Sequence, residues 1–110
     1  MADITKTSAV KNGNVTFTPT AGASSQTIVV SKDERMCVYV NNASASAVTA
    51  TIPKGNGICS AQGDLAVSVP ATSSMLIGPL ESARFVDTTT GKITLNLSAT
   101  TSVTVAAIQL

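Results

Sequence analysis

The chain has 110 residues, with no His and no Trp, two Cys, and a formal net charge of +1 at pH 7. Its length predicts one domain. Without His, a serine or cysteine nucleophile lacks its commonest general base. The seven basic residues are scattered along the chain, whereas phosphate binding requires them to cluster. We therefore predict a protein that is not an enzyme and has no nucleic-acid partner.

We predict that the start of the chain carries no export signal. Residues 1–10 lack the apolar run of a signal peptide, and no apolar stretch approaches the ~20 residues that span a bilayer. This predicts synthesis in a cytoplasm and no membrane association.

Residues 1–14 are predicted to be an N-terminal arm or edge strand, and residues 15–110 a β-sandwich domain. Asn12-Gly13 is a turn signal within the arm. Two alternatives stay open for this arm. It can add a strand to a neighbour's sheet edge, where backbone N–H and C=O groups are unpaired, or it can form the first strand of its own sandwich.

The rest of the chain alternates short runs of apolar and β-branched residues with turn-forming clusters. The most apolar run, residues 36–40, predicts a central strand covered on both faces. Within residues 80–86, a single helical turn is the alternative prediction to a strand. In chain order, the predicted strands are 15–18, 27–31, 36–40, 48–52, 65–69, 74–77, 83–86, 93–97 and 103–110.

The spacing of these strands, mostly roughly 8–12 residues, is typical of sandwiches and barrels. We predict an all-β fold: a single-domain antiparallel β-sandwich, jelly-roll or Ig-like, or a barrel of about eight strands. Val, Ile and Leu must build most of the core, because their branched side chains suit a pleated surface and aromatics are few. The three aromatics, Phe17, Tyr39 and Phe85, fall in strand patterns and are predicted to be core residues.

The segments between strands are predicted as turns and loops. Residues 32–35 form a charged turn, and Asn41-Asn42 with the Ala/Ser residues up to position 47 form a turn or loose loop. Residues 53–63 form a long loop that holds three of the seven glycines. This loop has no aromatic side chain on which a sugar could stack.

No catalytic, cofactor-binding or metal-binding residues are predicted. Gly55-Asn56-Gly57 lacks the third glycine of a dinucleotide-binding loop, since position 60 is serine. Two cysteines without any His cannot supply a four-ligand zinc site.

Cys37 and Cys59 are predicted to be free thiols, as in most cytoplasmic proteins. Cys37 lies in the most apolar run and is predicted to be buried, whereas Cys59 lies in the glycine-containing loop and is predicted to be partly exposed. Glu81 and Arg84 are close enough in sequence to form a local ion pair.

Two stretches, AQGDLAVSVP at residues 61–70 and IGPLESARF at residues 77–85, together with IQL at residues 108–110, resemble small virion structural proteins of tailed bacteriophages. The resemblance covers residues 36–110. It implies a non-catalytic β-sandwich, made in the host cytoplasm, that decorates the capsid of the virion by binding the major capsid protein. It also implies a homo-oligomer, such as a trimer.

The composition is compatible with that expectation, because a nearly neutral surface gives little colloidal protection and favours a protein that works in an assembly. A tail tube or adaptor component and a carbohydrate-binding module are the alternatives.

Overall fold

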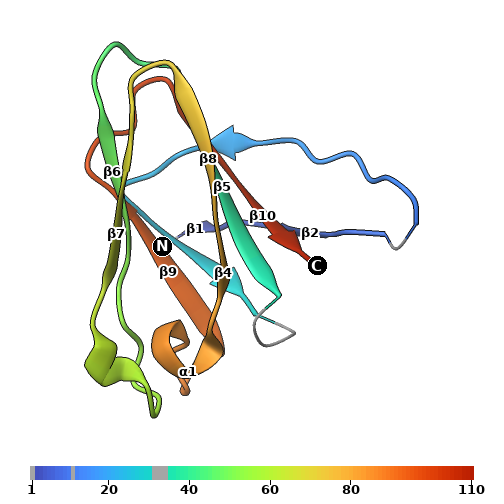
Figure 1. Cartoon of the computed structure of the whole chain (residues 1–110), viewed down its shortest axis with the longest axis vertical. Helices are drawn as coiled ribbons and strands as arrows, with labels where there is room; N and C mark the ends of the chain where they lie inside the picture. Colours follow the sequence, from blue (N-terminus) through green and yellow to red (C-terminus); the bar gives the residue numbers. More distant parts are fainter. Residues whose placement is uncertain (1, 11, 31–34) are drawn as a thin grey trace.

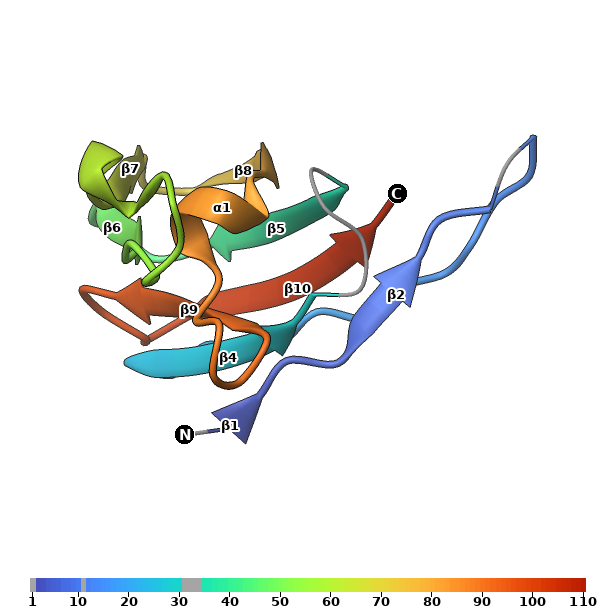
Figure 2. The same ribbon diagram turned by 90° about the horizontal axis from the view of Figure 1, so that it is seen from below.

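Two β-sheets pack face to face in the computed structural model, which describes residues 2–10, 12–30 and 35–110 (Figures 1 and 2). The arrangement is a sandwich and not a closed barrel. The predicted all-β sandwich is therefore confirmed. Of the predicted charged turn, residues 32–34 lie outside the described residues.

The first sheet has five strands in the order β1-β4-β9-β6-β7. Its β9 shows why these segments form strands, because Ile93, Leu95 and Leu97 alternate with more exposed polar residues and face the interior. The bounds are β1 Ala2–Asp3, β4 Ser25–Val29, β9 Lys92–Leu97, β6 Val48–Ile52 and β7 Leu65–Val69.

The second sheet has the order β2-β10-β5-β8, with β3 also paired to β10. Strand β5 is interior, as predicted for residues 36–40, and its first three residues are all buried. The bounds are β2 Lys6–Ser8, β10 Val103–Gln109, β5 Met36–Asn42, β8 Ser73–Leu80 and β3 Thr20–Ala21.

The core lies between the two sheets and consists almost entirely of aliphatic side chains. The buried residues that form it are Ile4, Ile28, Met36, Val38, Val40, Val48, Ala50, Ile52, Val69, Ile77, Leu80, Phe85, Ile93, Leu95, Leu97, Val103, Val105 and Ala107. Within the described ranges, no helix is long and apolar enough to cross a membrane.

Residues 2–8, here called the N-terminal strap, link the two sheets. Strand β1 pairs parallel with β4 of the first sheet, and β2 pairs parallel with β10 of the second. Ile4, between the two strands, is only 4% exposed and belongs to the core. The pairs between the longer strands are antiparallel, as predicted.

Residues 9–19, here called the projecting segment, connect β2 to β3. In Figure 2 the described part of this segment extends away from the sandwich and returns to it. The predicted strand at 15–18 is wrong, because these residues are exposed and unpaired. Strands β2 and β3 already occupy the edge of β10 that such a strand would need. The prediction that all three aromatics are core also fails here: Phe17 is 37% exposed and Tyr39 is half-buried, whereas Phe85 is in the core.

Strand β8 continues through Gly78-Pro79, where the sequence predicted an end. Pro79 has no backbone N–H to donate. It is tolerated because β8 is an edge strand, which pairs with a neighbouring strand on one side only. Gly78 has φ +119°, and the pairing register shifts opposite it, between Met36 and Val38.

The predicted strand at 83–86 is also wrong. Ser82–Phe85 form the single helical turn α1, which is the competing interpretation of this stretch. Asn41-Asn42 do not form a loose loop, because both residues belong to β5 and Asn42 is fully buried.

Candidate functional site

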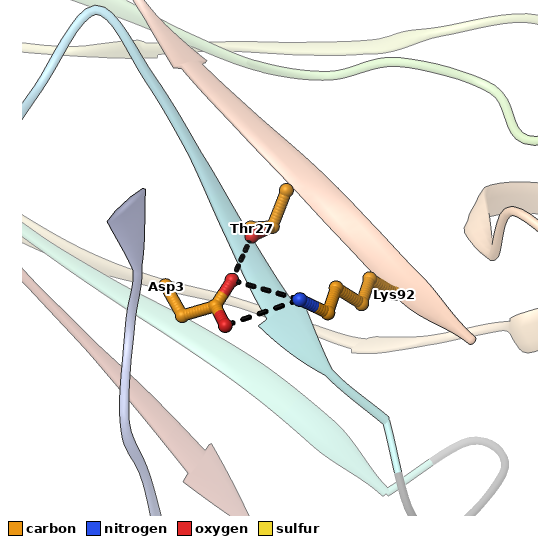
Figure 3. Close-up of polar contacts among 3 residues, drawn as sticks. All are labelled: Asp3, Thr27 and Lys92. Carbon is orange, nitrogen blue, oxygen red and sulfur yellow. Dashed lines mark hydrogen bonds and ion pairs between the residues drawn. The ribbon is translucent and has the colours of Figure 1, made fainter. Parts of the chain in front are cut away.

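A cluster of polar side chains lies on the outer face of the first sheet, where the N-terminal strap meets β4 and β9. The carboxylate of Asp3 accepts a hydrogen bond from the Thr27 hydroxyl, and Lys92 Nζ donates to both of its oxygens at 3.1 and 3.2 Å (Figure 3). The three residues come from β1, β4 and β9, which are neighbours in the sheet. This cluster fastens the first strand to the rest of the sheet.

The environment of Asp3 favours its ionised form. The hydrogen bond from Thr27 and, after it, the hydrogen bond from Lys92 lower the pKa of Asp3 below its ordinary value of 3.8. A carboxyl with a lower pKa in the folded state stabilises that state above the unfolded-state pKa. The stabilisation is lost as the pH falls through the folded-state pKa, so the loss belongs below about pH 4.

Acidification is therefore expected to loosen the N-terminal strap before it unfolds the sandwich. The Ile4 amide reports on the strap, because it donates to the Thr27 carbonyl at 2.8 Å. Its protection from hydrogen exchange should fall several-fold more between pH 6 and pH 3 than that of the Ile93 amide, as measured by NMR. Asp3→Asn is the control, and the same pH dependence in both proteins would contradict the assignment.

A surface cavity of about 300 Å³ adjoins this cluster. It is lined by Asp3, Thr27, Asp87, Thr90, Lys92 and Thr94. A second cavity of about 170 Å³ shares Asp87, Lys92 and Thr94 with the first and reaches the loop at residues 53–56. The two cavities are neighbours on the surface, one beside the strap and the other beside that loop.

The loop over residues 53–63, here called the braced loop, is held by α1 and by the turn after it. The Gly55 and Cys59 amides donate to the carbonyls of Arg84 and Ala83 at 2.8 and 2.9 Å. The Thr88 amide donates to Asn56 Oδ1 at 2.8 Å.

Two glycines allow this close approach. A Cβ at Gly55 would lie 2.1 Å from the Val86 carbonyl oxygen, and one at Gly57 would lie 2.6 Å from the Ala83 oxygen. Gly55-Asn56-Gly57 therefore has a packing role, which its spacing did not reveal.

Arg84 fixes the far end of the braced loop. Its Nε donates to the Gly63 carbonyl at 3.0 Å and its Nη2 to the Asp64 carbonyl at 3.3 Å. Its guanidinium also lies 4.7 Å from the centre of the Phe85 ring. The predicted local pair with Glu81 does not form, because the Arg84 guanidinium donates to the carbonyls of the loop instead.

Ile58 lies between the two closely packed glycines and the 3₁₀ turn Ser60–Gln62, and it is 91% exposed. The backbone around it is held in place, yet its side chain contacts mostly solvent. Sequence reasoning missed this residue, although the flanking glycines are the signal that a rigid, closely packed loop was present.

Both cysteines are free thiols, Cys37 buried and Cys59 half-buried. Burial raises the pKa of the Cys37 thiol. Among the described residues, no group of three or more His, Cys, Asp or Glu side chains gathers in a way that could hold a metal ion.

The chain matches no family model, and neither the curated proteins nor the solved structures contain a match to it. The candidate site is therefore defined by its own geometry: two neighbouring surface cavities beside the Asp3, Thr27 and Lys92 cluster, and a braced loop with an exposed isoleucine.

Proposed function

We propose that this chain is a non-catalytic structural protein of a tailed-phage virion that decorates the capsid. The observation that carries the proposal is Ile58, a large aliphatic side chain held in solvent by a braced loop. An apolar side chain on a pre-ordered loop is suited to binding another protein, because little backbone conformational entropy remains to be lost on contact. The major capsid protein is the proposed partner.

The location of the phage resemblance supports this loop as the contact. The stretch at 61–70 begins inside the braced loop, and the stretch at 77–85 contains α1. They meet in space through the hydrogen bonds of Arg84 to Gly63 and Asp64. The two stretches that resemble virion proteins therefore build the support of one surface feature.

Decoration would stabilise a capsid by linkage, because the protein binds the assembled lattice and not its dissociated subunits. Burying one Ile side chain contributes about 1.5–3 kcal/mol. That corresponds to about 10- to 100-fold in affinity for each contact. A homo-oligomer, such as a trimer, would multiply the effect by presenting several loops at once.

The test mixes purified protein with undecorated heads and images the particles by cryo-electron microscopy. Ile58→Asp should bind heads at least about 10-fold more weakly than the wild type. Ala61→Asp is the matched control, because it adds the same charge at an exposed position of the same loop. Failure of the wild type to bind heads in any maturation state would overturn the proposal.

A carbohydrate-binding module is the second candidate, because the structure exposes an aromatic pair. Phe17 and Tyr39 stack edge to face with ring centroids 5.6 Å apart, and Phe17 is 37% exposed. Titration with oligosaccharides, followed by the fluorescence of the single tyrosine, tests this function. Binding that is lost in Phe17→Ala and kept in Ile58→Asp would favour it over capsid decoration.

A tail tube or adaptor role is the remaining alternative. Tail-tube subunits usually pack a helix on the sheet, and the α-helix in the described chain is a single turn of four residues. Electron microscopy of the purified protein separates the two roles, since a tube subunit forms filaments and a decoration protein forms isolated oligomers.

A further inference from the structure

We propose that the N-terminal strap exchanges between two copies of this chain, so that residues 2–8 of one copy pair with β4 and β10 of the other. The partner in this exchange is a second copy of the same chain. The proposal concerns the protein by itself and does not depend on capsid binding.

The strap occupies a position that another copy's strap would fit equally well. It makes two short parallel pairings, of two residues with β4 and three with β10, and it places one side chain, Ile4, in the core. Without the strap, β4 would be a sheet edge, and so would residues 107–109 of β10, since β3 pairs only with Thr104 and Val105. Their unpaired backbone groups accept any strand that reproduces the same contacts.

The projecting segment is much longer than is needed in the closed form, in which the strap pairs with β4 and β10 of its own copy. Ser8, before the segment, pairs with Gln109, and Thr20, after it, pairs with Val105 on the same strand. Four residues along a strand span only about 13 Å. The eleven residues of the segment, 9–19, reach about 36 Å when extended.

That reach is comparable with the longest dimension of the molecule, 38 Å. A strap tethered at Thr20 can therefore reach the corresponding position on an adjacent copy. Beyond Ala9, whose amide donates to the Gln109 carbonyl at 2.7 Å, the projecting segment has little to hold it in its present path. Its described residues up to Thr18 are all exposed, and they contain no strand. Its ring contact is that of Phe17 with Tyr39.

Exchange preserves every strap contact, because the strap of each copy makes with the other copy the same contacts that it makes with its own sheets in the closed form. Asp3 of the partner would then complete the cluster with Thr27 and Lys92, and the partner's strap would fill the position of Ile4 in the core. Such exchange is a low-cost route to dimers because no new interface has to be built.

A disulfide between the strap and its position on β4 tests the proposal with purified protein. Asp3 and Thr27 are register partners, and their contact would be replaced by the disulfide in D3C/T27C, made with Cys59→Ser to remove the half-buried thiol. The protein is refolded at low and at high concentration, oxidised, and run on a denaturing gel without reductant. We expect covalent dimers whose fraction rises several-fold with protein concentration.

Deleting residues 12–16 from the same cysteine variant provides the control. The six remaining residues of the segment span about 20 Å, enough for the closed form but too short to reach another copy. This variant should give monomers with an internal disulfide at both concentrations.

Three results would overturn the proposal. Monomers only in both proteins would show that the strap stays on its own copy. Dimers in both would show that the segment length is not what permits exchange. The absence of any disulfide would show that residue 3 does not lie beside residue 27 in either form. Because no heads are present, none of these results bears on capsid decoration.

Discussion

Replacing Asn42 with alanine is expected to lower the free energy of unfolding by about 3 kcal/mol and the melting temperature by roughly 15 °C. The Asn42 side chain is fully buried at the end of β5. Its Nδ2 donates to the carbonyls of Ser46, Val69 and Pro70 at 2.8, 3.1 and 3.2 Å. Its Oδ1 accepts from the amide and hydroxyl of Ser44 at 3.0 and 2.6 Å.

Alanine retains none of these bonds, and a buried acceptor without a partner costs about 1–3 kcal/mol. Asn41→Ala is the matched control, because Asn41 precedes it in the same strand and is half-exposed. Urea and thermal denaturation of the two variants measure the difference. Equal losses of stability in both would contradict a structural role for the Asn42 bonds.

Replacing Gly55 with alanine is expected to detach the braced loop from α1 and to lower the free energy of unfolding by about 3 kcal/mol. The added Cβ would lie 2.1 Å from the Val86 oxygen and 2.5 Å from the Val86 carbonyl carbon, both backbone atoms that cannot rotate away. The hydrogen bond from the Cys59 amide to Ala83 would be lost with the contact.

Hydrogen exchange at the Cys59 amide should therefore accelerate strongly, while the amides of the core strands stay protected. Lys54→Ala is the control, because it changes an exposed side chain at the adjacent position. If the loop also binds heads, Gly55→Ala should weaken that binding without removing Ile58. A Gly55→Ala protein with wild-type exchange at Cys59 would mean that the loop is not held in this way.

Strands bounded by strong local signals could be predicted from the sequence. The predicted bounds 48–52 and 65–69 are those of β6 and β7, because alternation is regular in both and Pro53 and Pro70 follow them directly. The interior position of β5 followed from its unbroken apolar run.

Segments whose structure depends on a distant partner could not be predicted. Residues 15–18 alternate like a strand, yet β2 and β3 already occupy the edge that they would need. Residues 83–86 contain three apolar side chains and resemble a short strand, but they follow the edge strand β8 and pack as a turn against the braced loop. Alternation of apolar and polar residues shows that a segment can form a strand. It does not show that a sheet edge is free to pair with that segment.

The candidate site was beyond sequence reasoning for the same reason. Asp3 and Lys92 are 89 positions apart, and Asp3 and Thr27 are 24 apart. None belongs to a motif, and their meeting follows from the parallel pairing of β1 with β4. The exposure of Ile58 likewise follows from how tightly two glycines approach α1, which composition does not reveal.

The pairing of β2 with β10 constrains the order in which the sandwich can form during synthesis. Strand β10 lies between β5 and the N-terminal strands, and its register joins residue 6 to residue 107. The second sheet therefore lacks its interior strand β10 until the chain has been synthesised through β10 and has left the ribosome. Until then, the strap lacks β10, the strand with which β2 pairs. Such long-range pairing forms slowly, and the apolar surface that stays exposed in the meantime favours aggregation.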